Sequence, residues 1–429
     1  MAEKTIRVDV LSRVEGDGGI QVHVKDGKVE EVLVDIFEGP RMIEALVRGK
    51  TIHENISLVS RICAICTVSH RHVSIKAIEN ALKVEIPEKV KLLRYLMHLA
   101  EYIESHVLHV YFLALPDFFR KPSAIALLPT HGETVVEAIT LKKYGTELMK
   151  LTMGRKIHGE NPQIGGFGRI PTNKELDEFA EKAKEYAPMI ASTIDVLASL
   201  EIPDYCERET VFMCCNSPDG KFGFEGDSIL ISTGEEYPVD EYKKLTNERV
   251  VPHSYAKRSR YNDKPFTVGA LARLLLIGDR LTGMAKEKFE KHKTDRWKVN
   301  PLFNNISQAI EALWAFEQIP DLIEKIKTLP DTEIIVPEVK DGIGTAAVEA
   351  PRGTLYHSYE IKDHKIVNAD IITPTAQFLD DVEEFIRTAA EKLVAEDNEE
   401  TELHLEMIAR AYDPCISCSC HMVKLVKHD

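Results

Sequence analysis

The sequence predicts an α+β fold that is predominantly helical, with a bundle of long helices at its core and small antiparallel sheets at its periphery. Apolar residues recur with a helical period of about 3.6 over several long segments, whereas strand-like alternation is confined to short stretches. Strands and helices do not alternate regularly, which argues against a doubly wound parallel sheet. With 429 residues, 44% of them hydrophobic, the chain is long enough to bury a substantial core.

The chain is expected to begin with a small sheet and to continue with helices. Apolar and polar residues alternate in the first forty residues, and Asp26-Gly27 separates two β-rich runs, which is a hairpin signal. From Ile43 onward the apolar period is helical. After Pro87 a long helix is predicted by one apolar stripe, which comprises Leu92, Leu96, Leu99, Ile103, Val107 and Val110.

Further helices are expected at 132–152, 173–200, 266–292, 304–328 and 375–396. Thr172 and Glu175 offer a capping box for the second of these helices. Between the helices, a Gly- and Pro-rich stretch at about 205–262 contains short β-like runs, and a hairpin is expected at 354–372. No linker, repeat or low-complexity tract divides the chain, so residues 1–421 are expected to form a single domain.

Charge and cysteine usage narrow the classes of function. Lys and Arg number 54 and Asp and Glu number 69, a net charge of −15, which disfavours nucleic acid as a partner. The sequence contains neither a signal peptide nor a membrane span, so a cytoplasmic protein is expected. The abundance of charged residues leans toward a thermophilic source. In a reducing compartment, the eight cysteines are expected to act as metal ligands, redox thiols or buried apolar residues.

Two Cys-x-x-Cys pairs carry the strongest chemical signal. Cys63 and Cys66 form the first pair, and Cys415 and Cys418 form the second near the other end of the chain. Four thiolates favour zinc, an iron-sulfur cluster or nickel over magnesium or calcium. Spacing alone leaves open a structural Zn(Cys)4 site and two independent redox motifs.

The sequences around these pairs, RICAICTVSH and DPCISCSCH, resemble the signature motifs of the large, catalytic subunit of [NiFe] hydrogenases. SRVEGDG, RMIEALVRGK, IHGENPQIGG and EAPRGTLYH resemble further motifs of that family, in the same order along the chain. Within that family, the sequence ISCS in the second motif and the short chain length most resemble those of cytosolic, multisubunit, NAD(P)-linked enzymes, which include the sulfhydrogenases. The resemblance implies the [NiFe] hydrogenase large-subunit fold and the reversible heterolytic cleavage of H2.

The resemblance also implies the ligands of the metal centre. Cys63, Cys66, Cys415 and Cys418 would hold nickel, and Cys66 and Cys418 would bridge to an iron that carries one CO and two cyanide ligands. The terminal sulfurs of Cys63 and Cys415 would stay free to accept a proton, and Cys415 is the preferred acceptor.

Other residues have roles that are implied by similarity to the family motifs. Glu15 would be the first carboxylate on the proton path, and Arg352 would direct its guanidinium toward the open face of the metal pair and a cyanide. Without the resemblance, Glu15 is better interpreted as a turn residue and Arg352 as part of a surface salt bridge. His70 would donate a hydrogen bond to a bridging thiolate, and Asp413 would cap the turn before Cys415 and orient Arg352. The remaining residues of the cyanide pocket would be Pro351, Thr373, Pro374 and Thr375.

A second metal site is implied near the C-terminus. Glu44 lies 19 residues before Cys63, the separation at which the family places a glutamate that binds Mg²⁺ or a similar cation such as Fe²⁺. His421 and the backbone carbonyl of Ile371 would be the other protein ligands, a set that suits magnesium with several waters. Taken alone, Glu44 is better interpreted as part of a solvated helix face.

Electron transfer is expected to need other chains. Cys206, Cys214, Cys215 and Cys420 do not form an iron-sulfur motif, and the sequence has no Gly-x-Gly-x-x-Gly for a dinucleotide. The implied partners are an iron-sulfur small subunit, a flavin subunit that binds FAD and NAD(P), and a further iron-sulfur subunit, with sulfur or polysulfide reduction as a side activity. Residues 422–429 resemble a maturation tail that is removed after nickel insertion.

Two other functions remain as alternatives. One is a hydrogenase of the F420-reducing or methyl-viologen-reducing subgroup, and the other is a structural Zn(Cys)4 scaffold. A quinone-site subunit of a respiratory complex, which is related to the hydrogenase family, is discounted because such subunits lack the cysteine pairs.

Overall fold

The computed structural model of the protein describes residues 3–420, and more of these residues lie in helices than in strands. The helices are α1 (Ile43–Val47), α2 (Ile52–Val59), α3 (Thr67–Leu82), α4 (Glu88–Val107), α5 (Leu115–Phe118), α6 (Leu128–Met153), α7 (Asn173–Ser199), α8 (Lys243–Thr246), α9 (Ala270–Ile277), α10 (Gly283–His292), α11 (Asn304–Thr328), α12 (Pro374–Ala395), α13 (Thr401–Ala411) and α14 (Ile416–Ser419). The strands are β1 (Glu3–Val8), β2 (Gly18–Lys25), β3 (Lys28–Ile36), β4 (Pro162–Gln163), β5 (Gly166–Phe167), β6 (Val211–Asn216), β7 (Ser228–Ile231), β8 (Glu236–Pro238), β9 (Arg249–Val251), β10 (Ser254–Arg258), β11 (Phe266–Thr267), β12 (Gly342–Ala350), β13 (Gly353–Lys362) and β14 (Lys365–Ile372).

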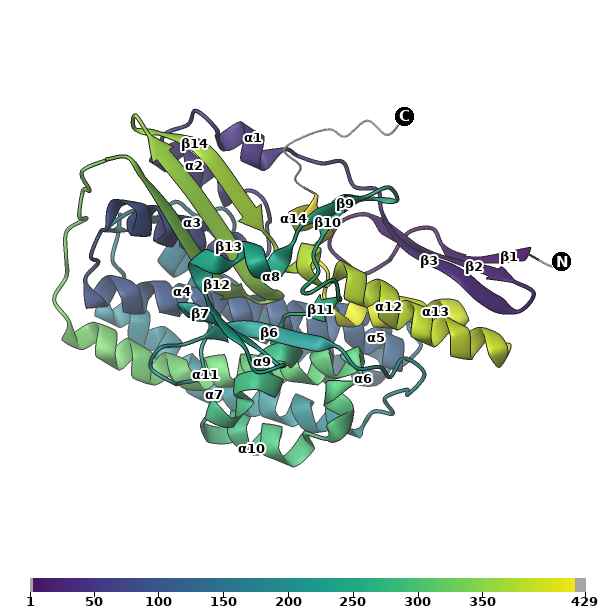
Figure 1. Ribbon diagram of the computed structural model, residues 1–429. Coiled ribbons are helices and arrows are strands. Elements are labelled where there is room, and N and C mark those ends of the chain that lie inside the picture. The colour runs from purple at the N-terminus through teal and green to yellow at the C-terminus, as the bar shows by residue number, and fades with distance from the viewer. Residues whose placement is uncertain (1–2, 421–429) are drawn as a thin grey trace.

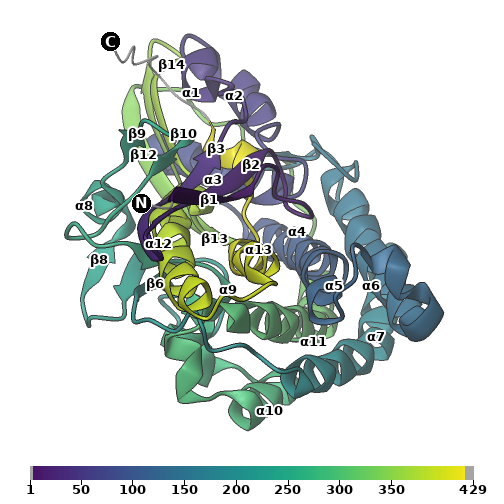
Figure 2. The same ribbon diagram turned by 90° about the vertical axis from the view of Figure 1, so that its right-hand side faces the viewer.

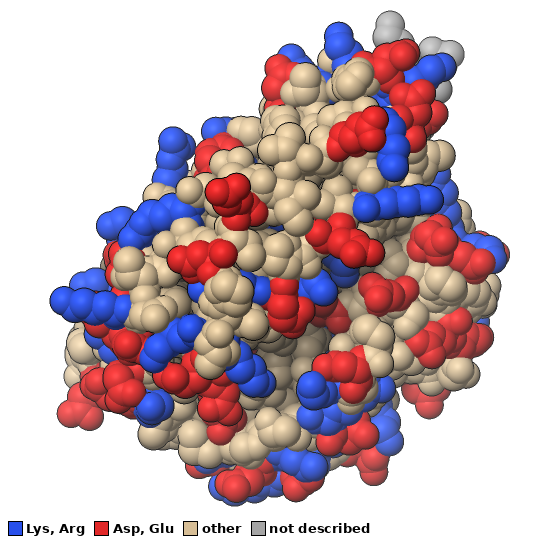
Figure 3. All heavy atoms as spheres, turned by 90° about the vertical axis from the view of Figure 1, so that its left-hand side faces the viewer, with Lys and Arg blue, Asp and Glu red and all other residues tan. Residues whose placement is uncertain are grey.

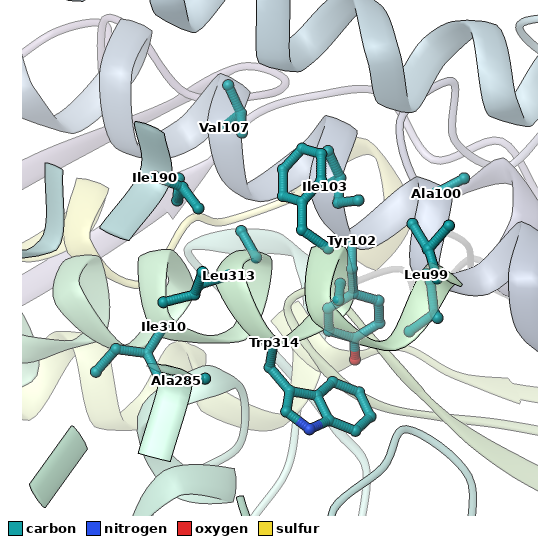
Figure 4. Close-up of a cluster of buried hydrophobic side chains, with 14 of the residues drawn as sticks. Leu99, Ala100, Tyr102, Ile103, Val107, Ile190, Ala285, Ile310, Leu313 and Trp314 are labelled. Carbon is teal, nitrogen blue, oxygen red and sulfur yellow. The ribbon is translucent and has the colours of Figure 1, made fainter. Parts of the chain in front are cut away.

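The long helices form the core. Helices α4, α6, α7 and α11 pack against one another in the lower half of Figure 1, and Figure 2 shows the same helices on one side of the sheets. The predicted apolar stripe is buried from Leu96 to Val110, whereas Leu92 at its start is half-buried. Figure 4 shows side chains of α4 meeting Ile190 from α7 and Leu313 and Trp314 from α11. Each such side chain contributes about 1.5–3 kcal/mol by leaving water.

Helix α4 does not end at Val107 but continues as a turn of π-helix, Leu108–Ala114. The wider turn brings His109 between two distant segments, where one ring nitrogen bonds Gln308 and the other lies 2.8 Å from the Arg410 carbonyl oxygen. Because π turns are uncommon and interrupt the regular hydrogen bonding of a helix, this segment marks a place where packing against the C-terminal region overrides helix regularity.

Within residues 3–420, four small sheets lie beside the helical core. Their strand orders are β1-β2-β3-β10-β9, β11-β6-β7-β8, β12-β13-β14 and β4-β5. The expected hairpin at Asp26-Gly27 is confirmed, and both of its turn residues have positive φ values, 50° and 77°. Most strand pairs are antiparallel, as expected, but β10 pairs with β3 and β11 pairs with β6 in parallel. In both parallel pairs the two strands are far apart in the sequence, and turn residues predict only the pairing of neighbouring strands.

The α+β, mainly helical fold class is confirmed, and most expected helices are present. The helix expected at 304–328 has these bounds in the structure, and α7 begins with the Thr172 and Glu175 capping box. The single helix expected at 266–292 is wrong: the segment forms β11, α9 and α10. Gly269 and Gly283, with φ values of 114° and 63°, set where α9 and α10 begin.

The sheets and helices converge on one region. Helix α3 packs against β12 and β13, and the short helix α14 lies beside the segment before β2, where Glu15 and Cys415 form a parallel bridge. Figure 1 shows the purple N-terminal and yellow C-terminal segments side by side at this point. Within residues 3–420, no helix combines the length and the apolar character needed to cross a lipid bilayer.

Candidate metal centre

The four cysteines of the two predicted pairs form one buried cluster. The Sγ atom of Cys63 lies 3.3 Å from that of Cys415, and the Sγ atom of Cys66 lies 3.4 Å from that of Cys418. The Cys415 and Cys418 sulfurs are 2.7 Å apart, and all four sulfurs lie within 4.8 Å of one another. The alternative of two independent redox motifs is therefore wrong, because the pairs face one another.

Each pair is placed by the start of a helix. Cys66 immediately precedes α3, and its backbone N–H donates to the sulfur of Cys63 at 3.2 Å. Cys415 precedes α14 and donates its backbone N–H to Thr375 Oγ1 at 2.9 Å. Backbone N–H groups at the start of α3 favour negative charge on the neighbouring sulfurs.

Glu15 lies directly beside the cluster. Its Oε2 atom accepts hydrogen bonds from Cys415 Sγ at 3.1 Å and from the Ser417 N–H at 3.0 Å, and its backbone carbonyl accepts from the Ile416 N–H at 2.9 Å. Burial and the nearby Cys63 raise the pKa of Glu15. The carboxyl group can therefore hold a proton closer to neutral pH than an exposed glutamate does.

Arg352 is buried at the end of β12 and retains an unused donor. Its Nε and Nη2 donate to the backbone carbonyl and Oδ1 of Asp413, at 2.8 Å and 2.9 Å. Its Nη1 is buried and has no hydrogen-bond partner among the described residues. Burial alone would lower the pKa of Arg352, but Asp413 and the neighbouring sulfurs raise it, so the guanidinium stays charged. The interpretation of Arg352 as a surface salt bridge is wrong, since the side chain is 3% exposed.

The expected cyanide-pocket residues lie at the ends of strands that meet the cluster. Pro351 precedes Arg352, and Thr373 and Pro374 lie between β14 and the body of α12. The Thr373 hydroxyl is buried without a partner in the described part of the chain, whereas Thr375 bonds the Cys415 backbone. Unused donors on Arg352 and Thr373, together with four clustered sulfurs, fit a metal that carries small polar ligands.

His70 takes part in a buried chain of hydrogen bonds. Its Nδ1 lies 3.2 Å from Nε2 of His357, whose Nδ1 lies 2.6 Å from the Tyr359 hydroxyl. His357 and Tyr359 were not predicted as site residues, although their alternate positions in the expected hairpin place them on one face of β13. The expected contact of His70 with a bridging thiolate stays a prediction.

The predicted magnesium ligands are partly brought together. Glu44 is 1% exposed, so the interpretation as a solvated helix face is wrong. Its Oε1 accepts from the Ile371 N–H at 2.9 Å, and Lys257 Nζ lies 3.6 Å from its Oε2. Lys257 is a cation beside Glu44 that the sequence did not indicate, because the two residues are far apart in the chain. His421 lies outside the described residues, as do residues 422–429.

The other cysteines are buried and belong to no metal-binding group of the described residues. Burial raises the pKa of both Cys206 and Cys420 to about 12, which keeps these thiols protonated and chemically inert.

Comparisons with known proteins agree with this geometry. The family model for nickel-dependent hydrogenase matches residues 41–160 and 229–421. The chain is 37% identical to the alpha subunit of sulfhydrogenase 1 of Pyrococcus furiosus, over 98% of both chains, and 40% identical to the alpha subunit of sulfhydrogenase 2 of that organism, over 98% of this chain and 100% of the relative. It is 31% identical to one chain of an F420-non-reducing hydrogenase of Methanocaldococcus jannaschii, over 90% of this chain and 98% of the relative.

Solved structures also match over nearly the whole length. An NAD⁺-reducing [NiFe]-hydrogenase in the H2-reduced state has a TM-score of 0.89 and 27% identity, over 97% of this chain and 99% of that chain. The Ni-Fe-Se hydrogenase from Desulfovibrio vulgaris Hildenborough, at 22% identity, shares the fold with a TM-score of 0.82, over 98% of this chain and 100% of that chain.

Proposed function

The chain belongs to the nickel-dependent hydrogenase family as a [NiFe] hydrogenase large, catalytic subunit, and from this premise we propose that its four-cysteine cluster holds a Ni-Fe centre for reversible H2 cleavage. When bound, this centre supplies the heterolytic splitting of H2 into protons and electrons. The observation that carries the proposal is the convergence of four buried sulfurs from opposite ends of the chain.

The cysteines divide the task of holding the metals. Cys63, Cys66, Cys415 and Cys418 would hold nickel, and Cys66 and Cys418 would also hold the iron. The unused donors at Arg352 Nη1 and Thr373 Oγ1 support an iron that carries CO and cyanide, because a buried donor without a partner is costly unless a ligand accepts from it.

Glu15 receives the proton that leaves the cluster. The Cys415 thiol donates to Glu15 Oε2 over 3.1 Å, so a proton held on that sulfur passes to the carboxylate without a bridging water. Burial and Cys63 raise the pKa of Glu15, so its carboxylate takes up a proton more readily than an exposed glutamate does. The positive Arg352 guanidinium holds Asp413, which lies two residues before Cys415, through two hydrogen bonds.

Electrons leave through partner subunits. Two similar proteins are named as alpha subunits of sulfhydrogenases, which supports an assembly with an iron-sulfur small subunit, a flavin subunit that uses NAD(P) and a further iron-sulfur subunit. The similarity to sulfhydrogenases also supports sulfur or polysulfide reduction by the same assembly. The magnesium site at Glu44, Ile371 and His421, and removal of residues 422–429 during maturation, complete the proposal.

The two alternatives have less support. The F420-non-reducing relative is less similar in sequence than the two sulfhydrogenase subunits. A structural zinc site needs only the four sulfurs, whereas here a buried carboxyl and a buried arginine with an unused donor also adjoin the cluster.

The decisive experiment measures the metal content and the infrared spectrum of the purified complex. One nickel per catalytic subunit is expected, with iron in excess of nickel because the iron-sulfur subunits also contribute iron, and with absorption from metal-bound CO and cyanide. Zinc without these bands would contradict the proposal. H2-dependent reduction of NADP⁺, NAD⁺, a viologen and polysulfide, compared in parallel, then identifies the electron acceptor.

A further inference from the structure

A second group of metal-binding side chains lies outside the four-cysteine cluster. It consists of His72 in α3, His98 in α4 and Glu225, which precedes β7. One ring nitrogen of each histidine and one carboxylate oxygen lie within 4.8 Å of one another. We propose that these three residues bind a divalent first-row transition-metal ion, for which Zn²⁺ is the best fit.

The hydrogen bonding of both histidines leaves ligand atoms unused. His72 is 3% exposed, its Nδ1 has no partner among the described residues, and its Nε2 lies 3.6 Å from Glu225 Oε1, beyond ordinary hydrogen-bond length. His98 is completely buried and bonds Ser69 Oγ through Nε2 at 3.2 Å, whereas its Nδ1 forms no hydrogen bond of ordinary geometry in the described chain, although the Glu349 backbone lies near the ring. A second-nitrogen bond of this kind orients a metal-binding imidazole.

Both imidazoles are in the protonation state that metal binding requires. Burial, together with Arg94 and Lys76, lowers the pKa of His72 well below its ordinary value. Burial and the neighbouring His72 lower the pKa of His98 to about 3. At neutral pH both rings therefore carry free electron pairs, and no proton has to be displaced when an ion binds.

The nearby cations Lys76 and Arg94 form ion pairs with acidic side chains, and these pairs leave one carboxylate oxygen of Glu225 available to an ion. Lys76 Nζ lies 3.9 Å from Glu225 Oε2 and 3.7 Å from Asp227, so it faces the oxygen that is not directed at His72. Arg94 forms two 2.7 Å bonds with Glu79. Two imidazoles and one carboxylate are a common ligand set for Zn²⁺, with a fourth position left for water.

The group borders a groove through which an ion can enter. The groove has a volume of about 810 Å³, and His72 and Glu225 line it together with the exposed Lys91, Asp219 and Lys221. Figure 3 shows the face of the molecule that lies on the left in Figure 1. This face is hollowed and carries both basic and acidic side chains. Two buried histidines and a half-buried carboxylate beside an open groove provide both access for water to the fourth position and a route for the ion.

A bound ion would join elements that support the cysteine cluster. His72 lies on the helix that begins directly after Cys66, and Glu225 forms a bridge with Val348 in β12, the strand that leads to Arg352. The ion would therefore brace α3 against α4 and β12. We expect a stabilising role, since neither histidine touches the cysteine sulfurs in the described hydrogen bonds.

The test uses the full-length chain purified with its natural partners. The protein is incubated with Zn²⁺, freed of unbound ion, and analysed for zinc beside nickel and iron. One extra zinc per chain is expected. Glu225→Gln should weaken zinc binding by roughly 10- to 100-fold, and His72→Gln should remove it. His53→Gln changes an exposed histidine elsewhere on the surface and should bind zinc like the unmodified protein.

Co²⁺ distinguishes this site from the cysteines. Cobalt bound by nitrogen and oxygen gives visible ligand-field bands without the strong near-ultraviolet charge transfer that thiolates cause. Absence of the extra zinc, zinc that Glu225→Gln retains in full, or sulfur-to-cobalt transitions would each overturn the proposal. The Glu225 side chain is 32% exposed, so Glu225→Gln is expected to fold, and unchanged nickel and iron contents verify that the cysteine cluster is intact.

Discussion

Two buried arginines near the end of β12 have opposite hydrogen-bonding states. Arg273 in α9 uses all five of its N–H groups: it donates to both carboxylate oxygens of Glu311 at 2.6 Å and 2.7 Å, to Glu349 at 2.6 Å, and to the carbonyls of Ala350 and Pro351 at 3.2 Å and 2.9 Å. Its guanidinium also lies over the Tyr102 ring, 5.3 Å from the centroid.

Arg352, the residue after Pro351, bonds Asp413 alone among the described residues and leaves Nη1 unused. Burial by itself therefore does not tell a structural arginine from a ligand-binding one. These two arginines differ in that Arg352 alone of the pair keeps an unpaired donor beside the cysteine cluster. Because Arg273 holds the Pro351 carbonyl, the saturated arginine positions the unsaturated one.

The contrast between Arg352 and Arg273 would fail if the cluster beside Arg352 were not a metal centre. Cys415→Ser replaces a soft thiolate with a poor ligand, so we expect total loss of H2 turnover and of bound nickel. Nickel analysis and H2 oxidation assays measure the two effects. Cys206→Ser, at a buried cysteine outside the cluster, is the control and should retain nickel; normal turnover by Cys415→Ser would refute the site.

Glu15→Gln tests the proton acceptor on the Arg352 side of the molecule. We expect bound nickel to be retained and the H/D exchange rate to fall by about 10²- to 10⁴-fold, because the amide cannot take the proton from Cys415. Glu38→Gln changes a half-buried carboxylate that accepts from the Asp17 N–H in the same loop. An equal rate loss in both variants would attribute the effect to loop disorder.

Arg352→Lys tests whether the positive charge of Arg352 is sufficient or whether the several N–H donors of its guanidinium are also needed. Lysine keeps the positive charge but cannot bond Asp413 twice and also present a free donor, so we expect a loss of about 10²-fold in H2 oxidation. The free energy of unfolding should change little by comparison. Shifted CO and cyanide infrared bands would verify that the lost donor faces the metal ligands, and unshifted bands with full activity would contradict this.

Arg273→Lys should reverse that pattern. Lysine cannot form all the hydrogen bonds that Arg273 makes to Glu311, Glu349 and the backbone, so buried acceptors are left without partners. We therefore expect the protein to lose about 3 kcal/mol of stability. Denaturant unfolding measures the loss. Activity per molecule that retains nickel should fall less than in Arg352→Lys; a larger fall would mean that Arg273 acts on the centre directly.

The last comparison concerns buried acids with and without an arginine beside them. Arg273 overcomes the effect of burial and lowers the pKa of Glu311, whereas burial raises the pKa of Glu101 to about 8. Between pH 4.5 and 8 the folded state therefore holds a proton on Glu101 that the unfolded state releases. Stability should decline by up to about 1.4 kcal/mol per pH unit as pH rises through this window.

Glu101→Gln tests this directly, because the amide resembles the protonated acid and should flatten the decline. Unfolding measured at intervals across the window, in the unmodified protein and the variant, gives the two slopes. Equal slopes would show that Glu101 is already ionised in the folded protein.

Features with a local sequence signal were predictable. The apolar period gave α11 its bounds, and the Cys-x-x-Cys spacing with its flanking motifs identified the four sulfurs. Gly269 and Gly283 lie in the segment expected as one helix, and glycine lowers helix propensity without revealing where a helix will stop. Apolar periodicity also does not name a strand's partner, so the parallel pairing of β10 with β3 could not be predicted.

Contacts between distant residues were missed for the same reason. Arg273 and Glu311, or His98 and Glu225, have no spacing in common that marks them as partners, because tertiary packing brings them together. The family motifs placed Arg352 and Asp413 near the cluster, but they gave no information about which guanidinium nitrogen stays unpaired.

Cys63 and Cys415 lie 352 residues apart in the chain but side by side in the structure, so a metal that joins them lowers the conformational entropy of the unfolded chain. A metal held by all four sulfurs closes most of the chain into a ring, and the ring persists when the rest of the protein unravels. The chain-entropy relation for cross-links of this length gives a stabilisation of about 6 kcal/mol, because the denatured chain loses that much freedom. Loading the metal would therefore stabilise helices that never contact it.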